Sequence, residues 1–295
     1  MFFQMKQALR KRLLGQRTQQ QLIDDHAALA RLGNRDYLEG YPALRPATFE
    51  PPFQAYEFSQ YSQNGEDGLI LHLLSKVGAD AHFIVEIGTE DGRECNSANL
   101  VLNFGWRALL VEMNAEAVTR GSAYFAHCGV AERLQFLNAR ALPESINALL
   151  AAQQVPMEID VLSIDIDSHD YWLWQALEGF RPRVVVIEYN ASFGAERAVT
   201  IPYPASSVNQ PPHRYYHGAS LAALCRLGTR KGYVLVGCDS RGVNSFFVRR
   251  DLAAVAALPA VTSQQAFRTH RRRGRRMSQA DQYALVSRLP LVEVE

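Results

Sequence analysis

Long apolar runs are missing from this sequence. No stretch of its 295 residues holds the roughly 18 consecutive apolar residues that a transmembrane helix needs, so no membrane span is expected. The chain opens on apolar residues and reaches its basic ones later, the reverse of a signal peptide. Neither a membrane span nor a signal peptide is therefore expected.

Cysteine is also scarce. The chain has four cysteines, without a Cys-x-x-Cys pair or a zinc spacing: Cys95, Cys128, Cys225 and Cys238. A redox pair or a zinc site is therefore not expected. Small, buried, reduced thiols are the simpler interpretation, and they predict a cytoplasmic protein because the cytoplasm is reducing.

An excess of either charge is absent as well. Lys and Arg total 31 against 30 for Asp and Glu, a net charge of +1. Such balance disfavours a protein that wraps nucleic acid, although local imbalance remains open. The hydrophobic fraction of 47% and the length of 295 residues indicate one large folded domain with appendages.

Three regions can be distinguished along the chain. Residues 1–56 predict an N-terminal helical extension, with a helix over 1–32 and a proline-rich arm over 40–54. Residues 57–250 form the main domain, with a long insertion at 191–218. Residues 251–295 read as a basic C-terminal tail with a helix near 278–288.

The main domain alternates short apolar runs with helical segments, beginning with a helix over residues 62–77. The runs lie at 83–87, 108–112, 134–137, 161–165 and 184–188, followed by a hairpin of 233–238 and 243–248. Continuous apolar runs fit strands that are covered on both faces. The pattern predicts an α/β fold, a doubly wound and mostly parallel sheet of about seven strands that ends in a β-hairpin.

A glycine-containing turn follows the first strand, in Glu86-Ile-Gly-Thr-Glu-Asp-Gly92. The dinucleotide fingerprint G-x-G-x-x-G is absent because Glu90 takes the place of its second glycine. Three carboxylates in this turn disfavour a pyrophosphate and suit a cationic ligand. Glu112 ends the second strand, where an acid can accept hydrogen bonds from both hydroxyls of a ribose. A generic turn with an exposed glutamate is the alternative.

These residues resemble a known family. The pattern Glu86-x-Gly88-x-x-x-Gly92, then Glu112 and the late hairpin, is similar to class I S-adenosylmethionine-dependent methyltransferases. The segment from Asp160 to Asp170 resembles the FkbM-like branch, with Ser163, Asp167 and Ser168 in place of its usual Lys, Glu and Gly. Residues 62–67, Ser-Gln-Asn-Gly-Glu-Asp, resemble the motif that precedes that domain.

The resemblance implies a Rossmann-like methyltransferase fold, S-adenosylmethionine as the cofactor, and methyl transfer to a hydroxyl of a sugar or glycan. It also implies contacts to the methionine part, to the ribose through Glu112 and to the adenine through Asn138. The implied cofactor-binding residues are Gln63, Glu86, Gly88, Thr89, Gly92, Glu112, Asn138 and Asp165.

Acidic side chains follow the fourth and fifth strands, whose ends open on one crevice. Asp165, Asp167 and His169 are the candidate catalytic residues. Asp167, Glu188 and Asn190 could hold Mg²⁺ or another divalent cation, as in catechol-type and macrolide-sugar methyltransferases. Without a metal, His169 would be the general base. The alternatives are purely structural roles: helix N-capping by the two aspartates and a helix-start position for His169.

The insertion at 191–218 and the end of the fifth strand supply the candidate acceptor-binding residues Tyr189, Tyr216 and His217. Long loops of this kind are often lids or binding loops. An ordinary surface loop with inward-facing aromatics is the competing interpretation.

Basic side chains gather at both ends of the chain, in residues 1–20 and 268–276. They suit an anionic partner or the inner face of a membrane, and a homodimer contact is equally open. Nucleic acid is not expected. Two rival functions remain: a non-catalytic nucleoside-binding or scaffold protein on the same fold, and a nicotinamide-dependent oxidoreductase, which the missing fingerprint disfavours.

Overall fold

The structure, a computed structural model, describes residues 53–203 and 213–295. The predicted helix over residues 1–32 and nearly all of the proline-rich arm lie outside this part of the chain. The basic segment 1–20 lies outside it too. Among the described residues, no helix combines the length and the apolar character needed to cross a bilayer.

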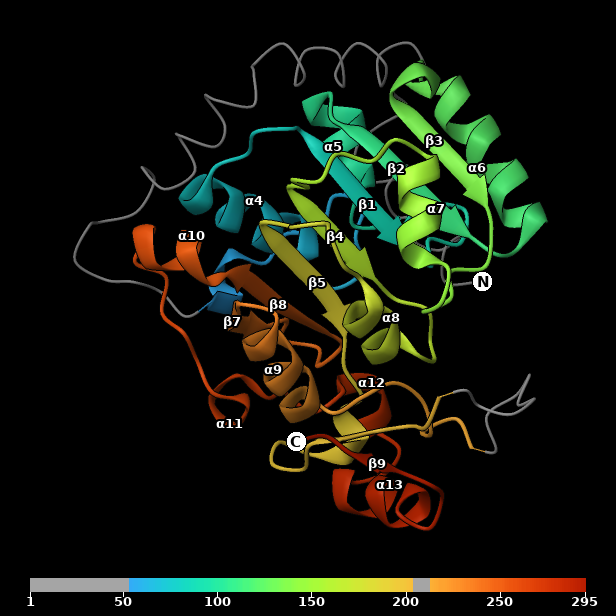
Figure 1. Ribbon diagram of the computed structural model, residues 1–295. Coiled ribbons are helices and arrows are strands. Elements are labelled where there is room, and N and C mark those ends of the chain that lie inside the picture. Colours follow the sequence, from blue (N-terminus) through green and yellow to red (C-terminus); the bar gives the residue numbers. More distant parts are fainter. Residues whose placement is uncertain (1–52, 204–212) are drawn as a thin grey trace, which may run out of the picture.

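A seven-stranded sheet forms the centre of the molecule, in the order β3-β2-β1-β4-β5-β8-β7 (Figure 1). Its strands are β1 (Phe83–Ile87), β2 (Arg107–Glu112), β3 (Leu134–Asn138), β4 (Val161–Ile164), β5 (Val184–Glu188), β7 (Tyr233–Cys238) and β8 (Asn244–Arg249). The first five run parallel, and β8 runs antiparallel to both β5 and β7. The predicted doubly wound sheet with a closing hairpin is confirmed.

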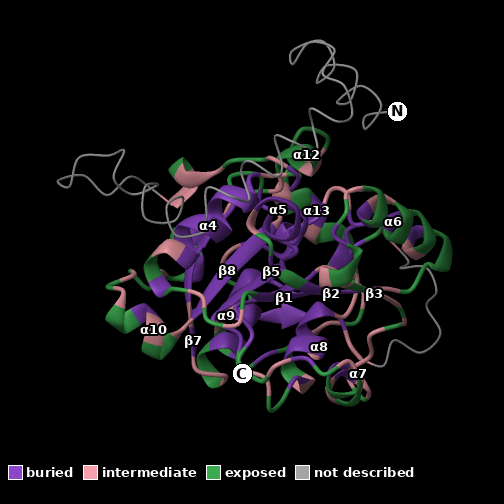
Figure 2. Cartoon of the chain, turned by 90° about the horizontal axis from the view of Figure 1, so that it is seen from above, coloured by how far each residue is buried: buried purple, intermediate pink, exposed green. Residues whose placement is uncertain are grey.

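Helices cover both faces of the sheet, as the continuous apolar strands predict. Strands β1, β4 and β5 are buried along their whole length, and Figure 2 shows them inside the helical layers. One face packs on α4 (Glu66–Val77), α5 (Ala98–Phe104), α6 (Ala115–His127) and α10 (Arg250–Val255). The other packs on α7 (Ile146–Ala152), α8 (Asp170–Ala176) and α9 (Leu221–Arg230).

Two predicted helix boundaries shift. The helix expected over residues 62–77 begins only at Glu66, because Gly65 before it adopts a left-handed backbone with φ of 100°. Residues 60–62 instead donate backbone hydrogen bonds to the carboxylate of Asp67. The tail helix expected near 278–288 is α13, Gln279–Val286, which begins after the N-cap Ser278.

The tail and the insertion fold together into one unit beyond the carboxyl ends of β4 and β5 (Figure 1). Strand β6 (Val199–Thr200) of the insertion pairs with β9 (Val292–Glu293) near the end of the chain. A small third core joins Phe193, Tyr215 and Tyr216 to Val286 of α13. The unit also contains η3 (Ala191–Phe193) and α12 (Arg271–Gly274). The tail helix α11 (Ser263–Ala266) packs instead on β7 and α9 of the main domain, and η1 (Phe53–Tyr56) and η2 (Ala131–Arg133) lie elsewhere.

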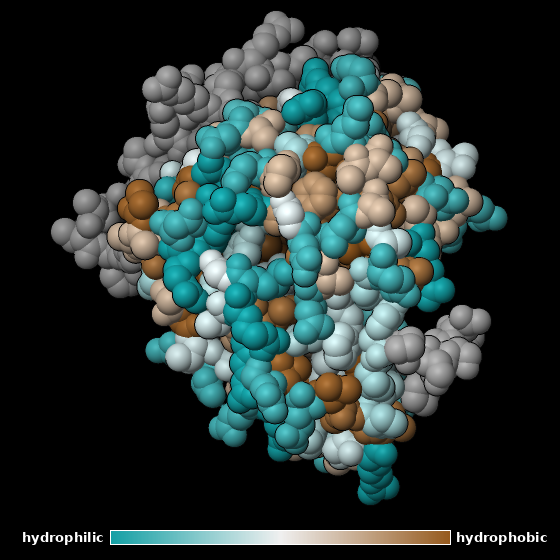
Figure 3. Space-filling model, in the orientation of Figure 1, coloured by the Kyte–Doolittle hydropathy of each residue, from teal (hydrophilic) through white to brown (hydrophobic). Residues whose placement is uncertain are grey.

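Polar residues dominate the face of the molecule shown in Figure 3, with apolar residues scattered among them. Among the described residues, the large apolar side chains that remain exposed are far apart in sequence, for example Met113, Met157 and Val255. Scattered apolar residues of this kind are ordinary for a folded domain.

Candidate functional site

The main crevice lies at the carboxyl ends of β1, β2 and β4, where the strand order reverses. It consists of two adjoining cavities of about 290 and 870 Å³, which share Gly88, Glu90, Asp91, Asp165 and Asp167. A doubly wound sheet binds its ligands at this switch point. The position of the crevice therefore follows from the topology.

Gly88 brings the turn after β1 against the end of β4. Its backbone has φ of 85°, and its N–H donates to the carbonyl of Val111 at 2.9 Å. A Cβ at this position would lie 1.7 Å from the carbonyl oxygen of Asp165. Glycine is therefore required here. Gly92, with φ of 68°, packs instead against Phe125 and lines neither cavity.

The smaller cavity is strongly acidic. Carboxylates that line it are Glu66, Glu86, Glu90, Asp91, Glu94, Asp165 and Asp167, and no lysine or arginine is among its lining residues. Gln63 and Thr89 also line it, and the buried hydroxyl of Thr89 has no hydrogen-bond partner among the described residues. Such a cavity attracts a positively charged group. A ligand bound there can also form hydrogen bonds with the carboxylates and with the Thr89 hydroxyl.

Glu86 is buried in the wall of this cavity. Its two carboxylate oxygens accept the backbone N–H groups of Asn96 at 2.8 Å and Ser97 at 2.7 Å. Burial raises the pKa of Glu86 despite these bonds. The side chain thus fixes the segment before α5.

The larger cavity contains the acid predicted at the end of β2. Glu112 accepts the N–H of Glu90 at 3.0 Å and that of Asn114 at 2.8 Å. The exposed side chain of Met113 lies beside it in the cavity wall. Asn138 is not among the lining residues. Its amide donates to the carbonyls of Glu112 and Met113, so it orients this turn.

Asp165 lies where the two cavities meet. Burial first, then repulsion from Asp170, raises the pKa of Asp165 well above its ordinary value. Asp165 and Asp167 do not cap the following helix, which is the structural alternative for them. Helix α8 begins at Asp170, and its N-cap residue is His169. Asp170, which sequence reasoning missed, holds the loop by accepting the N–H groups of Ile166 and Ser168.

His169 lies in the wall of the larger cavity beside Tyr203, with 5.2 Å between the ring centroids. Its Nε2 is buried and has no hydrogen-bond partner among the described residues. Burial lowers the pKa of the imidazole. His169 is also the N-cap residue of α8, and it interacts with the backbone of Pro202, so the expected helix-start role is confirmed. The second ring nitrogen, Nε2, stays unpartnered among the described residues of the cavity wall.

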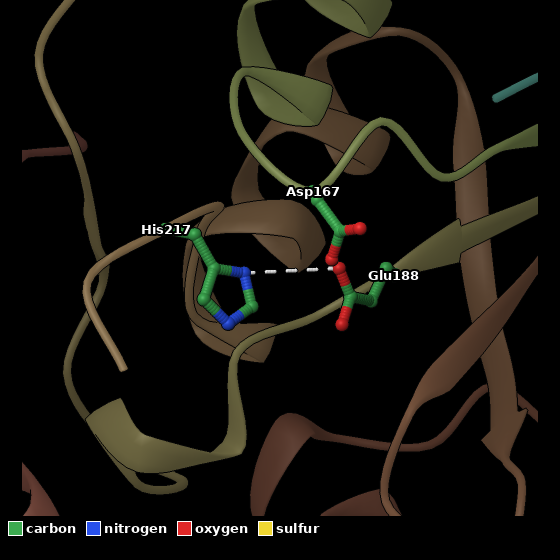
Figure 4. Close-up of side chains that lie close together, drawn as sticks. All are labelled: Asp167, Glu188 and His217. Atoms are coloured by element: carbon green, nitrogen blue, oxygen red, sulfur yellow. Dashed lines mark ion pairs between the residues drawn. The ribbon is translucent and has the colours of Figure 1, made fainter. Parts of the chain in front are cut away.

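A second cluster joins Asp167, Glu188 and His217 at the ends of β4 and β5 (Figure 4). One ligand atom of each lies within 4.8 Å of the others, and Nδ1 of His217 lies 3.8 Å from Oε2 of Glu188. Both ring nitrogens of the buried His217 lack a hydrogen-bond partner among the described residues. Burial lowers its pKa to about 3, while burial and neighbouring acids raise the pKa of Glu188.

Asn190, expected beside Glu188 as a cation ligand, has a different task. Its amide donates to the carbonyls of Tyr215 at 2.7 Å and His217 at 2.8 Å, and its Oδ1 caps Ser192. These bonds position the loop that carries His217. The third group facing Asp167 and Glu188 is thus His217, which the sequence suggested only for acceptor binding.

Tyr189 and Tyr216, also expected at the acceptor, line neither cavity. The hydroxyl of Tyr189 donates to the carbonyl of Arg268 at 2.7 Å and accepts its N–H at 3.1 Å. The hydroxyl of Tyr216 donates to the carbonyl of Pro290. Both tyrosines anchor the tail on the main domain.

The arginine-rich tail reaches the site through a single side chain among the described residues. Arg273 of α12 lies 3.9 Å from Oε1 of Glu188 and donates to Oδ1 of Asn190 at 3.3 Å. Its neighbours Arg271, Arg272, Arg275 and Arg276 are exposed. The sequence could not distinguish Arg273 from the neighbouring arginines. Its side chain is directed inward only because of its position on the short helix α12.

No protein-family model and no curated protein matches the sequence. Solved structures with a similar chain path include an O-methyltransferase from Bacillus cereus in complex with SAH, at 18% identity over 72% of this chain and 88% of that chain, with a TM-score of 0.39. The N-terminal domain of EvdMO1 in the presence of SAH and D-fucose is 14% identical over 73% of this chain and 96% of that chain, with a TM-score of 0.42. Cofactor-bound Rv0187 from MTB is 15% identical over 73% of this chain and 96% of that chain, also with a TM-score of 0.42. Likenesses at this level carry no conclusion about substrate, and the strand order of the chain itself establishes the Rossmann-like sheet.

Proposed function

We propose that this protein is an S-adenosylmethionine-dependent methyltransferase that modifies a hydroxyl of a sugar or glycan. The observation that carries the proposal is the pairing of two adjoining cavities. One has a carboxylate at the end of β2 that suits a ribose, and the other is lined by carboxylates that suit a cation. A nucleoside that carries positive charge on its far end matches both.

The residues present fit this cofactor. Glu112 can accept hydrogen bonds from two ribose hydroxyls, and Gly88 leaves room where a side chain would collide with Asp165. The unpartnered hydroxyl of Thr89 and the surrounding carboxylates suit an ammonium group. The same carboxylates disfavour the pyrophosphate of a nicotinamide dinucleotide, so the oxidoreductase alternative is weak.

When bound, the cofactor would supply an electrophilic methyl group on a sulfonium. The chain would hold the acceptor hydroxyl in line with that group, and such positioning alone can account for much of a rate enhancement. His169 would take the hydroxyl proton on Nε2, which is buried and unpartnered among the described residues. Asp165, at the junction of the cavities, would orient the reacting groups.

Residues near His169 and on α12 suit a carbohydrate acceptor that carries anionic groups. Tyr203 next to His169 offers an aromatic face to a sugar ring, and the exposed arginines of α12 suit carboxylate or phosphate substituents. Attachment to a membrane surface and homodimer formation stay predictions, as does the cytoplasmic location.

Isothermal titration calorimetry with S-adenosylmethionine and S-adenosylhomocysteine tests the proposal. We expect both to bind and Glu112→Gln to weaken binding about tenfold or more, equivalent to about 1.4 kcal/mol. Glu116→Gln, on the exposed surface of α6, is the matched control and should bind normally. Absence of binding by both ligands would contradict the proposal. Binding without methyl transfer to any glycan would favour the non-catalytic alternative.

A further inference from the structure

The cluster at the ends of β4 and β5 has the features of a metal centre. We infer that Asp167, Glu188 and His217 bind a divalent transition-metal ion, of the class Mn²⁺, Fe²⁺, Co²⁺ or Zn²⁺, at the inner end of the crevice. This replaces the ligand set with Asn190, and it changes the class of ion from Mg²⁺.

The distances suit an ion after a small closure. Neighbouring ligand atoms around an ion with bonds of about 2.0–2.2 Å lie about 3–3.6 Å apart, so the side chains would have to approach one another by about 1 Å. The three donor atoms lie within 4.8 Å of one another, and the pair formed by His217 and Glu188 is 3.8 Å apart. Figure 4 shows the two carboxylates turned toward each other with the imidazole beside them.

His217 provides the independent sign of a missing ligand. The residue is 5% exposed, yet neither ring nitrogen has a hydrogen-bond partner among the described residues. A buried polar atom left unpaired costs about 1–3 kcal/mol, so native structures seldom contain one without a reason. An imidazole nitrogen with a free lone pair is the commonest metal ligand among side chains.

The charges around the cluster point the same way. Asp167 and Glu188 bring two carboxylates together, and the single positive charge of Arg273 can balance only one of them. Arg273 lies at Oε1 of Glu188, whereas His217 faces Oε2. Among the described residues, no basic side chain forms an ion pair with Asp167. A divalent cation between Asp167, Oε2 and His217 would supply the missing charge without displacing Arg273.

The donor types select the class of ion. Imidazole nitrogen suits Mn²⁺, Fe²⁺, Co²⁺ and Zn²⁺, whereas Mg²⁺ prefers oxygen ligands and retains several waters. Asp167 lines both cavities, so an ion it binds would face the crevice and leave positions for acceptor oxygens. Metal binding does not depend on the proposed methyl transfer and is measured without cofactor.

Titration of EDTA-treated, dialysed full-length protein with MnCl₂ alone tests the inference, with free Mn²⁺ followed by electron paramagnetic resonance. We expect one tight equivalent, with at least tenfold weaker binding in His217→Ala and in Asp167→Asn. Asp167 is exposed and no described residue donates a hydrogen bond to its side chain, so its variant should fold even if His217→Ala does not. His169→Ala, the nearby histidine outside the cluster, is the control and should bind Mn²⁺ normally.

Three results would overturn the inference: no Mn²⁺ binding, unchanged binding in Asp167→Asn and His217→Ala, or Mg²⁺ binding as tight as that of Mn²⁺. Unchanged binding in the two variants would place the ion among the carboxylates of the smaller cavity. Loss of metal binding with normal S-adenosylhomocysteine binding would leave the proposed function standing, and the reverse result would leave the metal site standing.

Discussion

At the scale of single residues, the geometry of the site depends on a few positions where one added or removed atom would change the path of the backbone. Gly88 lies so close to the carbonyl of Asp165 that a methyl group cannot be accommodated. Asp170 and Asn190 use their polar atoms on backbone groups and thereby hold the loops that carry Asp167 and His217. Positioning and contact are thus divided between neighbouring side chains.

Gly88→Ala should destabilise the protein and abolish cofactor binding. A positive φ costs an alanine roughly 1 kcal/mol, and the clash with Asp165 forces a backbone shift that costs more. Gly129→Ala is the matched control, because Gly129 also has positive φ, 73°, and a Cβ added there would meet nothing within 4 Å. Thermal denaturation and calorimetry measure both effects. Equal destabilisation by the two variants would argue against the close approach.

The pH profile of methyl transfer should report His169. The acceptor proton can be taken only by the neutral ring, and burial lowers the pKa of this histidine below its ordinary 6.5. Activity should therefore persist as pH falls through 6.5 and decline only at lower pH. In His169→Gln, kcat should fall about 10²–10⁴-fold while cofactor affinity changes little. An unchanged kcat would remove His169 from the reaction.

At the scale of elements, the sequence predicts the sheet well, because a buried strand leaves a local signature. Runs such as Val184–Glu188 are apolar along nearly their whole length, and the predicted bounds of the strands agree with the structure to within one residue. The start of α4 differs from its prediction since one glycine in a left-handed conformation decides it.

The cluster is harder to predict because its members are distant in sequence. Asp167 and Glu188 can be found from their places after neighbouring strands. His217 lies near the end of a long insertion whose path has no periodic signal, and Asn190 is the more obvious candidate because it follows β5 directly. Arg273 cannot be distinguished by sequence from the other arginines of the tail.

The tail should loosen when its contact with the insertion is removed. Buried Gln282 of α13 accepts the hydroxyl of Ser192 at 2.8 Å and donates to the carbonyl of Met277 at 2.8 Å. Gln282→Ala should cost about 1–3 kcal/mol and speed hydrogen exchange in residues 277–294. Exposed Gln264→Ala is the control. Unchanged exchange in the tail would mean that β6 and β9 hold the unit without this contact.

At the scale of the whole molecule, near-zero net charge conceals a separation of charges. Carboxylates line the crevice at the switch point, whereas exposed arginines lie on α12 beyond the ends of β4 and β5. The tail contributes Arg273, which lies 3.9 Å from Glu188 in the cluster at the ends of β4 and β5. A cationic cofactor and an anionic acceptor would thus approach surfaces of opposite sign.

On the proposed function, the crevice binds the nucleoside of S-adenosylmethionine with its sulfonium end toward Asp165. A crystal structure of the full-length protein with S-adenosylhomocysteine tests this most directly. We expect ribose hydroxyls on the carboxylate of Glu112, the amino group among the carboxylates near Thr89, and the sulfur between the two cavities. A ligand bound elsewhere, or one whose ribose does not contact Glu112, would rule out this mode of binding.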